Sequence, residues 1–272
     1  GLTIAVEQGP IGASGGLYGS IDPLNFNGAL QVTLPSLTIG ALGGYAQIGS
    51  DPSFFMYVSV NRPLFGYPFF FLDGIAGGLG FNRDLMIPDI DGVAGFPLVA
   101  WATGRNPPGA NPNGDIESQV QSVVQALAGD IPPKAGQYWV AAGIKFSSFK
   151  VLDSFALVTI VFGTEFKFAL LGLTTASLPP QTGGGIDPLG YVEMALRASF
   201  SPQTGILEIE AKLTPASYIL NRACSLTGGF AYSMWFKDNP SGAADGYHAG
   251  DFVVTLGGYN PAYTAPAFFP KM

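Results

Sequence analysis

The sequence predicts a mainly β protein: a large curved antiparallel sheet, a β-sandwich or an open barrel, with one or two helices packed against it. Three observations favour this class. Apolar and polar residues alternate with period two in several segments. Glycine accounts for 38 of the 272 residues, about twice its usual share. Only 11% of the residues are charged, so much of the surface is expected to be neutral or apolar and available to a partner.

The first part of the chain is expected to consist of strands. Residues 28–34 (GALQVTL) and 37–48 (LTIGALGGYAQI) are two early strands of this part. Residues 54–61 (FFMYVSVN) follow them and carry apolar side chains on both faces or nearly so. Such a strand is predicted to be covered on both sides.

The stretch 64–82, LFGYPFFFLDGIAGGLGFN, admits three interpretations: a membrane segment, a phosphate-binding loop or a packed strand. Pro68, Asp73 and the glycines interrupt any run long enough to span a membrane. A phosphate loop requires a helix N-terminus directly after it, and the following residues contain no helix start. We therefore expect a strand that is rich in glycine where other backbone, or a bound molecule, comes close.

A single β-rich domain is expected to span residues 1–272, with a helical and loop insert at about 84–135. Two strand-rich blocks, roughly 1–82 and 138–265, flank this insert. Neither block shows enough polar faces to close itself, so both are expected to belong to one antiparallel sheet system.

Helices are expected within the insert. In DIESQVQSVVQALAG (115–129) the apolar residues recur at helical spacing. Asp115 is placed to cap the start of this helix and Gly129 to end it. A weaker helical pattern, DIDGVAGFPLVAWA (89–102), is opened by Pro88.

Strands dominate again after the insert. Residues 155–162 (FALVTIVF), 165–171 (EFKFALL) and 252–256 (FVVTL) are apolar on both faces or nearly so, which predicts cover on both sides. Residues 190–200 and 206–213 alternate strictly and are joined by a short turn, which predicts a hairpin. We expect its apolar side to be buried and its charged side to face water, with charges paired across the strands.

Several carboxylates could carry chemistry. Asp84, Asp89 and Asp91 resemble a fragment of a calcium loop, but the distal carboxylate and the full ligand spacing are missing. Helix capping and turn formation are the favoured roles for these aspartates. A carboxylate-dependent hydrolase that uses Asp84, Asp89 or Glu193 stays open as the least favoured function.

Other candidate catalytic groups are few. Glu193, Glu208 and Glu210 could form an acid–base pair, although paired surface charges are the ordinary explanation. His248 is the only histidine and is expected in a loop, and Cys224 is expected to be a buried small hydrophobe. The sequence therefore assigns no catalytic residue, no metal ligand and no cofactor.

Aromatic residues crowd two regions, one around residues 54–71 and one that includes Trp139 and residues 230–236. They are expected either to fill the core or to line an apolar groove or contact surface. The candidates for contact with a ligand are Phe55, Tyr57, Phe69, Phe71, Trp139 and Trp235.

Charge and hydropathy exclude some partners. The net charge of −7 with only 12 Lys and Arg residues provides no basic surface for nucleic acid or anionic lipid. No window is apolar enough for a transmembrane helix, and the first residues do not form a signal peptide. The chain begins in an apparent strand, so a segment of a longer protein is expected, and its localisation is undetermined.

Six phrases, in order along most of the chain, carry a resemblance to a known family. They are GLGFNRDLMIP (78–88), FPLVAW (96–101), YWVAAGIKFSSF (138–149), VFGTEFKFALLGL (161–173), LTGGFAYSMWF (226–236) and AGDFVVTLGGYNPAY (249–263). With them the chain resembles the domain of unknown function 6603 family. The resemblance implies a module of large bacterial, and some fungal, multidomain proteins, and it provides no catalytic residues.

Two binding functions are expected ahead of the hydrolase. The first is a non-enzymatic structural or binding module of a larger bacterial protein, which presents an apolar surface or groove to neighbouring segments, to like copies or to an apolar small molecule. An exposed sheet edge is expected where neighbouring segments continue the sheet. The second is a carrier whose curved sheet wraps lipid-like molecules.

Overall fold

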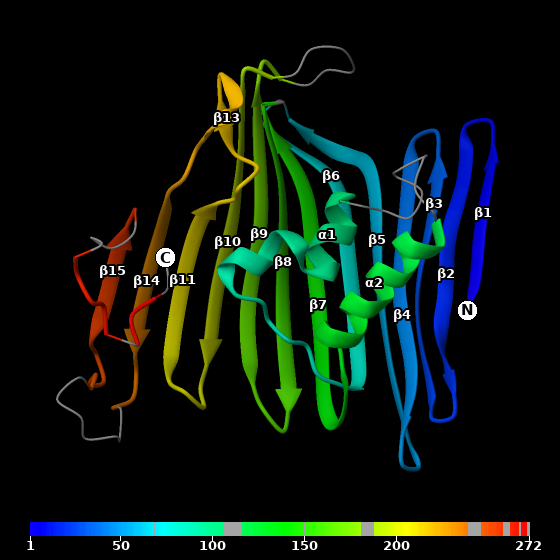
Figure 1. Cartoon of the computed structure of the whole chain (residues 1–272), viewed down its shortest axis with the longest axis horizontal. Coiled ribbons are helices and arrows are strands. Elements are labelled where there is room, and N and C mark those ends of the chain that lie inside the picture. The colour runs from blue at the N-terminus through cyan, green and yellow to red at the C-terminus, as the bar shows by residue number, and fades with distance from the viewer. Residues whose placement is uncertain are drawn as a thin grey trace.

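The computed structural model describes residues 1–67, 69–105, 116–149, 151–180, 188–238, 246–257, 262–266 and 268–270. These residues form one open antiparallel sheet and three helical segments (Figure 1), which confirms the mainly β prediction. The strands are β1 (Leu2–Gln8), β2 (Ile11–Ile21), β3 (Leu24–Leu34), β4 (Leu37–Ile48), β5 (Asp51–Tyr67), β6 (Phe70–Arg83), β7 (Pro133–Ser148), β8 (Leu152–Gly163), β9 (Lys167–Leu178), β10 (Gly190–Ser201), β11 (Ile206–Leu213), β12 (Tyr218–Ile219), β13 (Asn221–Ser225), β14 (Gly229–Trp235) and β15 (Phe252–Leu256). The helical segments are the 3-10 helix η1 (Ile90–Gly95), α1 (Pro97–Thr103) and α2 (Ile116–Asp130).

Strand order across the sheet follows chain order. The order runs from β1 through β11 to β14 and β15, while the small β12–β13 ladder attaches to β10. Neighbours in sequence are neighbours in space, so most connections are short turns. The long insert between β6 and β7 does not separate these two strands, because they pair directly, for example Leu79 with Val140. The two strand-rich blocks of the sequence therefore belong to one sheet, whose edges are β1 and β15.

The predicted strand segments all lie in or overlap observed strands. Residues 28–34, 37–48, 54–61 and 252–256 fall within β3, β4, β5 and β15. The predicted hairpin is formed by β10 and β11, with Arg197 paired to Glu210. Most observed strands are longer than predicted, because antiparallel pairing continues into less strictly patterned residues.

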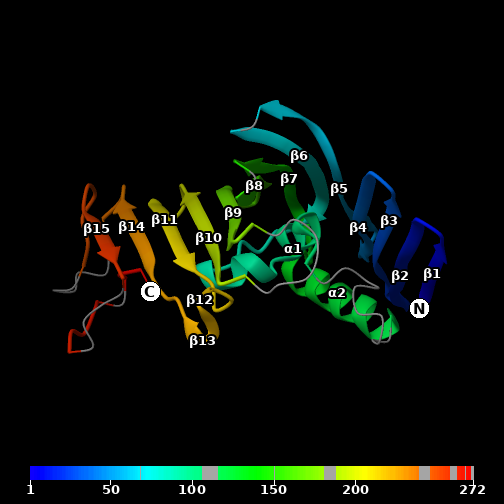
Figure 2. The ribbon, with the colours of Figure 1, turned by 90° about the horizontal axis from the view of Figure 1, so that it is seen from above.

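The helical segments all lie on one side of the sheet (Figure 2). Helix α2 packs on β1, β2 and β3, helix α1 packs on β5, β8 and β9, and η1 packs on β9, β10 and β11. We call this side the covered face and the opposite side the uncovered face. Within the described ranges, no helix is long and apolar enough to cross a membrane.

The core lies between the covered face and these helical segments. Tyr57, Trp139 and Leu157 point from neighbouring parts of the sheet into it, and Leu98 and Leu127 enter from α1 and α2. All five side chains are fully buried. Burial of a large apolar side chain contributes about 1.5–3 kcal/mol, so these contacts fix the helical insert on this face.

The predicted helix at 89–102 is observed as two segments. Pro97 starts α1, and Phe96 before it has an extended backbone with φ −60° and ψ 127°. A residue before proline is pushed away from helical dihedrals, so a continuous helix cannot form through Phe96. Helix α2 continues through Gly129 to Asp130, and the proposed cap Asp115 lies outside the described residues.

Several expectations about burial are wrong. In the β10–β11 hairpin the charged side faces the core, with Glu193 1% and Glu210 8% exposed, whereas Met194 is 36% exposed. The reason is that η1 packs on this hairpin and that each buried charge has a partner. The pairing of charges across the two strands was expected, but alternation cannot reveal that η1 covers the charged side. Within the described ranges, the strands expected to be covered on both sides are covered on one. Cys224 is exposed on β13.

Of the stretch 64–82, residues 70–82 lie in strand β6, as expected, whereas residues 64–67 form the end of β5, which pairs with β6. Gly78 faces Tyr57, and a Cβ at Gly78 would be 2.7 Å from the carbonyl oxygen of Met56. Gly80 lies between the two large side chains of Phe55 and Trp139, and a Cβ there would overlap the indole nitrogen of Trp139. The glycines of β6 therefore make room for the aromatic core of the neighbouring strands.

We predict that Gly80→Ala lowers the free energy of unfolding by about 1–3 kcal/mol, because the new methyl group overpacks the core against Trp139. The measurement is urea denaturation followed by tryptophan fluorescence. Gly77→Ala is the control: it lies on the same strand, points to the uncovered face, and its Cβ would be 3.6 Å from the nearest atom. This control is expected to change stability by no more than about 0.5 kcal/mol. If the two variants lower the free energy of unfolding equally, the packing role of Gly80 is contradicted.

Candidate functional site

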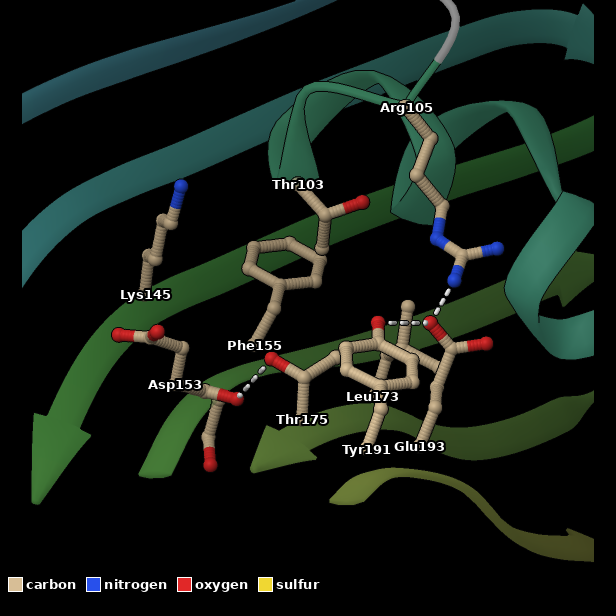
Figure 3. Close-up of a pocket in the computed structure, with 10 residues that line it drawn as sticks. Thr103, Arg105, Lys145, Asp153, Phe155, Leu173, Thr175, Tyr191 and Glu193 are labelled. Carbon is tan, nitrogen blue, oxygen red and sulfur yellow. Dashed lines mark hydrogen bonds and ion pairs between the residues drawn. The ribbon is translucent and has the colours of Figure 1, made fainter. Parts of the chain in front are cut away.

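A polar cleft of about 370 Å³ opens on the covered face beside the end of α1 (Figure 3). The floor is formed by β7 to β10, and Arg105, which follows α1, closes one side. The lining residues are Thr103, Arg105, Lys145, Asp153, Ser154, Phe155, Leu173, Thr175, Tyr191 and Glu193. The cleft therefore holds two acidic and two basic side chains.

Glu193 is held on all sides in this cleft. Its carboxylate forms an ion pair with Arg105, accepts a hydrogen bond of 2.6 Å from the Thr214 hydroxyl, and accepts one of 3.1 Å from the Tyr191 hydroxyl. Burial raises the pKa of Tyr191, so this hydroxyl keeps its proton and can donate. Both carboxylate oxygens are occupied by partners. The arrangement anchors the insert to β10.

The opposite end of the cleft is formed by Asp153 and Lys145. The Thr175 hydroxyl donates to the backbone carbonyl of Asp153 over 3.5 Å, which joins β8 to β9 (Figure 3). A hydrolytic pair of carboxylates needs one oxygen free to donate or accept a proton at the reacting bond. Glu193 has no such free oxygen, so the cleft favours a structural role over acid–base catalysis.

The aspartates considered for metal binding or hydrolysis do not form one site. Asp84 is 4% exposed and binds Lys134 at 2.9 Å, and Lys167 lies 3.9 Å from its other oxygen. Asp89 is exposed where η1 begins, and Asp91 forms an exposed ion pair of 2.9 Å with Lys212. Among the described residues, no group of three or more His, Cys, Asp or Glu side chains is placed to hold a metal ion.

A second cluster of buried charge joins β10 and β11. One guanidinium nitrogen of Arg197 lies 2.9 Å from a Glu208 oxygen and 2.7 Å from a Glu210 oxygen. Burial raises the pKa of Glu210 in spite of the opposing effect of Arg197. Glu208 and Glu210 therefore form a network with Arg197 on the covered face and do not face Glu193 as an acid–base pair. His248 is exposed, as expected for a loop histidine, and its backbone N–H donates to Asp251.

The aromatic residues considered for ligand contact fall into three places. Phe55, Tyr57 and Trp139 are buried together on the covered face, with the rings of Phe55 and Trp139 6.4 Å apart. Their burial favours a core role. Trp235 is buried elsewhere, against Tyr247 at 4.8 Å and Phe268 at 5.5 Å between ring centroids.

Phe69 and Phe71 lie at the β5–β6 turn, away from the buried aromatics. Phe69 is 57% exposed and stacks on Tyr67 with ring centroids 5.7 Å apart, and Phe71 is half-buried. The six candidate residues are therefore not gathered in one groove, and ligand contact through them stays a prediction.

The uncovered face carries an apolar surface that extends across the whole main path of the sheet. The cross-strand register defines a row that passes through all the strands from β1 to β15 on the main path of the sheet. Its members are Leu2, Leu17, Gly28, Gly43, Met56, Leu79, Val140, Ile160, Phe168, Phe200, Leu207, Met234 and Phe252. The next two rows on this face, from Ile4 to Val254 and from Val6 to Leu256, are equally free of polar and charged residues apart from the tyrosine hydroxyl of Tyr232.

The size of this surface decides how unusual it is. Strands are spaced by about 4.8 Å, and rows on one face by about 6.8 Å, so three rows across the sheet cover on the order of 800 Å². The largest apolar patch of a typical monomer is about 300–600 Å². The side chains remain accessible: Met56 is 55%, Leu79 44% and Val140 43% exposed.

An apolar hollow of about 660 Å³ interrupts this surface over β2 to β5. Its floor contains Gly28 and Gly43, which pair with each other, and larger side chains surround it. These larger side chains are Leu17, Leu24, Phe26, Leu30, Tyr45 and Met56. The hollow therefore results from two paired glycines between longer neighbours.

Sequence reasoning missed both the hollow and the polar cleft. A signal for the hollow was present, since glycine or alanine stands at apolar positions of the alternation in 28–34 and 37–48. Only the register shows that Gly28 and Gly43 are adjacent. The cleft has no local signal, because it combines Arg105 of the insert with residues from four strands.

These features define a class of protein: an open antiparallel sheet with a helical insert on one face and an apolar surface on the other. The family of unknown function DUF6603 has a model that matches residues 1–272, and the chain belongs to this family. No curated protein and no solved structure matches the chain.

We predict that Glu193→Ala lowers the free energy of unfolding by about 1.5–3 kcal/mol, because the Tyr191 and Thr214 hydroxyls and Arg105 lose a buried charged acceptor. Chemical denaturation measures the change. Glu208→Ala is the matched control, since Arg197 keeps Glu210 as a partner and Glu208 is 34% exposed. Glu208→Ala is expected to lower the free energy of unfolding by less than about 1 kcal/mol. If Glu193→Ala lowers it by no more than this control does, the anchoring role of Glu193 is contradicted.

Proposed function

We propose that this chain is a non-enzymatic binding module whose uncovered face is the contact surface for an apolar partner. The observation that carries the proposal is the run of three cross-strand rows without a charged side chain from β1 to β15. Transfer of such a surface out of water contributes about 25 cal/mol per Å². An apolar partner would therefore gain a large driving force by covering it.

The covered face supports the non-enzymatic part of the proposal. Its buried carboxylates Asp84, Glu193 and Glu210 are each engaged by a basic side chain. Such pairs hold the insert and the hairpin in place, and they leave the opposite face free for contact. The module role in a larger bacterial protein, which the family resemblance implies, is part of the same proposal.

The direct test introduces a charge in the centre of the uncovered face. Val140→Lys is expected to weaken retention on a phenyl matrix and to lower the fluorescence of the apolar dye ANS, because a lysine there disrupts the apolar rows. Gln125→Lys, on the exposed side of α2, is the control with the same charge change. Circular dichroism and thermal unfolding verify that both variants keep the fold.

The two variants distinguish the uncovered face from the exposed side of α2. If only Val140→Lys weakens matrix retention and lowers ANS fluorescence, the result supports the uncovered face as the apolar contact surface. If the unsubstituted protein binds neither the matrix nor the dye, or if both variants behave alike, the proposal is wrong.

A further inference from the structure

We propose that the apolar hollow over β2 to β5 binds the acyl chain of a single lipid molecule. This inference rests on the proposed function of the uncovered face as an apolar contact surface, and it specifies the ligand class of one part of that face. The hollow is the part where the surface is recessed and not level.

The shape of the hollow follows from the register. Across the strands, Leu17, Gly28, Gly43 and Met56 form one row, with a large side chain at each end and two glycines between. One step along the strands, the paired Phe26 and Tyr45 raise a wall on one side. On the other side Leu30 stands beside Ala41, so this wall is lower. The result is a trough bounded by side chains and floored by backbone.

The chemistry of the lining selects hydrocarbon. Within the described residues that line the hollow, the Tyr45 hydroxyl is the one polar side-chain group, and no charged side chain lines it. The backbone N–H and C=O groups of the floor belong to strand ladders, so they are not free to bind a ligand. A charged or strongly polar head group would find no counter-charge here and must remain in water. Each methylene group buried contributes about 0.8 kcal/mol, which favours an alkyl chain.

The volume agrees with one chain of a lipid. Sites for small molecules typically measure about 300–1,000 Å³, and the hollow has about 660 Å³. A flexible alkyl chain can follow a recessed trough. A second copy of the sheet would span the rim formed by Leu17 and Met56, and it would fill the space above Gly28 and Gly43 only if one of its large side chains projected into the hollow. A flexible alkyl chain has no such requirement, so the hollow favours an acyl chain as its occupant.

The test compares two glycines on the uncovered face. A Cβ at Gly43 would be 3.4 Å from its nearest neighbour, the carbonyl oxygen of Phe55, and a Cβ at Gly77 would be 3.6 Å from that of Ala141. Both positions accept a side chain without a clash at Cβ. Gly43→Leu fills the floor of the hollow, whereas Gly77→Leu adds the same side chain outside it.

The probe is cis-parinaric acid, a fluorescent fatty acid, titrated as a monomer into the purified chain. We expect the unsubstituted protein and Gly77→Leu to bind it with similar affinity, and Gly43→Leu to bind at least tenfold more weakly. Thermal unfolding and circular dichroism verify that both variants are folded. Vesicles of neutral phosphatidylcholine, tested by co-sedimentation, distinguish binding of a single lipid from adsorption to a membrane.

Each outcome bears on a different claim. Equal affinity of Gly43→Leu and Gly77→Leu, or binding to vesicles without binding of monomeric fatty acid, overturns the acyl-chain site. If no fatty acid binds while Val140→Lys still weakens dye and matrix binding, the acyl-chain site is wrong and the apolar contact function stands. If Val140→Lys has no effect, the contact function itself fails.

Discussion

The antiparallel register that continues from β1 to β15 is the constraint on which the other features depend. Side chains of a strand alternate between the two faces, so a shift of one residue in any pair would exchange them. The register shifts of the β5–β6 and β6–β7 pairs lie outside the three apolar rows, so the row from Leu2 to Phe252 stays on one face. The apolar surface, its hollow and the aromatic core of the opposite face all follow from that continuity.

The helical insert gives the two faces different roles. It leaves the sheet after β6 and returns at β7, and its described helical segments pack on the covered face. There the glycines of β6 admit Tyr57 and Trp139, and Arg105 pairs with the buried Glu193. The buried carboxylates Asp84, Glu193 and Glu210 are tolerated inside because each is paired with a basic side chain, since an unpaired buried charge costs several kcal/mol. The three apolar rows of the uncovered face contain no such network. Covering them with an apolar partner would therefore release free energy by removing apolar surface from water.

Much of the fold could be predicted from sequence, and the sites largely could not. Period-two alternation located the strands, and helical spacing located α2, because both are local properties of the backbone. The direction in which the β10–β11 hairpin faces was predicted wrongly. Alternation separates the side of Met194 from the side of Glu193, but it does not tell which side the insert covers. The hollow required knowledge that Gly28 and Gly43 are neighbours across a pair of strands.

The sequence by itself determined the class of structure, the insert between two strand blocks and the shortage of charge on which the proposal of an apolar contact function rests. Tertiary structure decided which face is buried, which carboxylates are locked in ion pairs and where the sheet is hollow. The physical reason is that propensity and periodicity act over a few residues, whereas these properties arise between residues distant in sequence. Arg105 and Glu193, or Leu17 and Met56, acquire a common role only when the register and the insert bring them to one place.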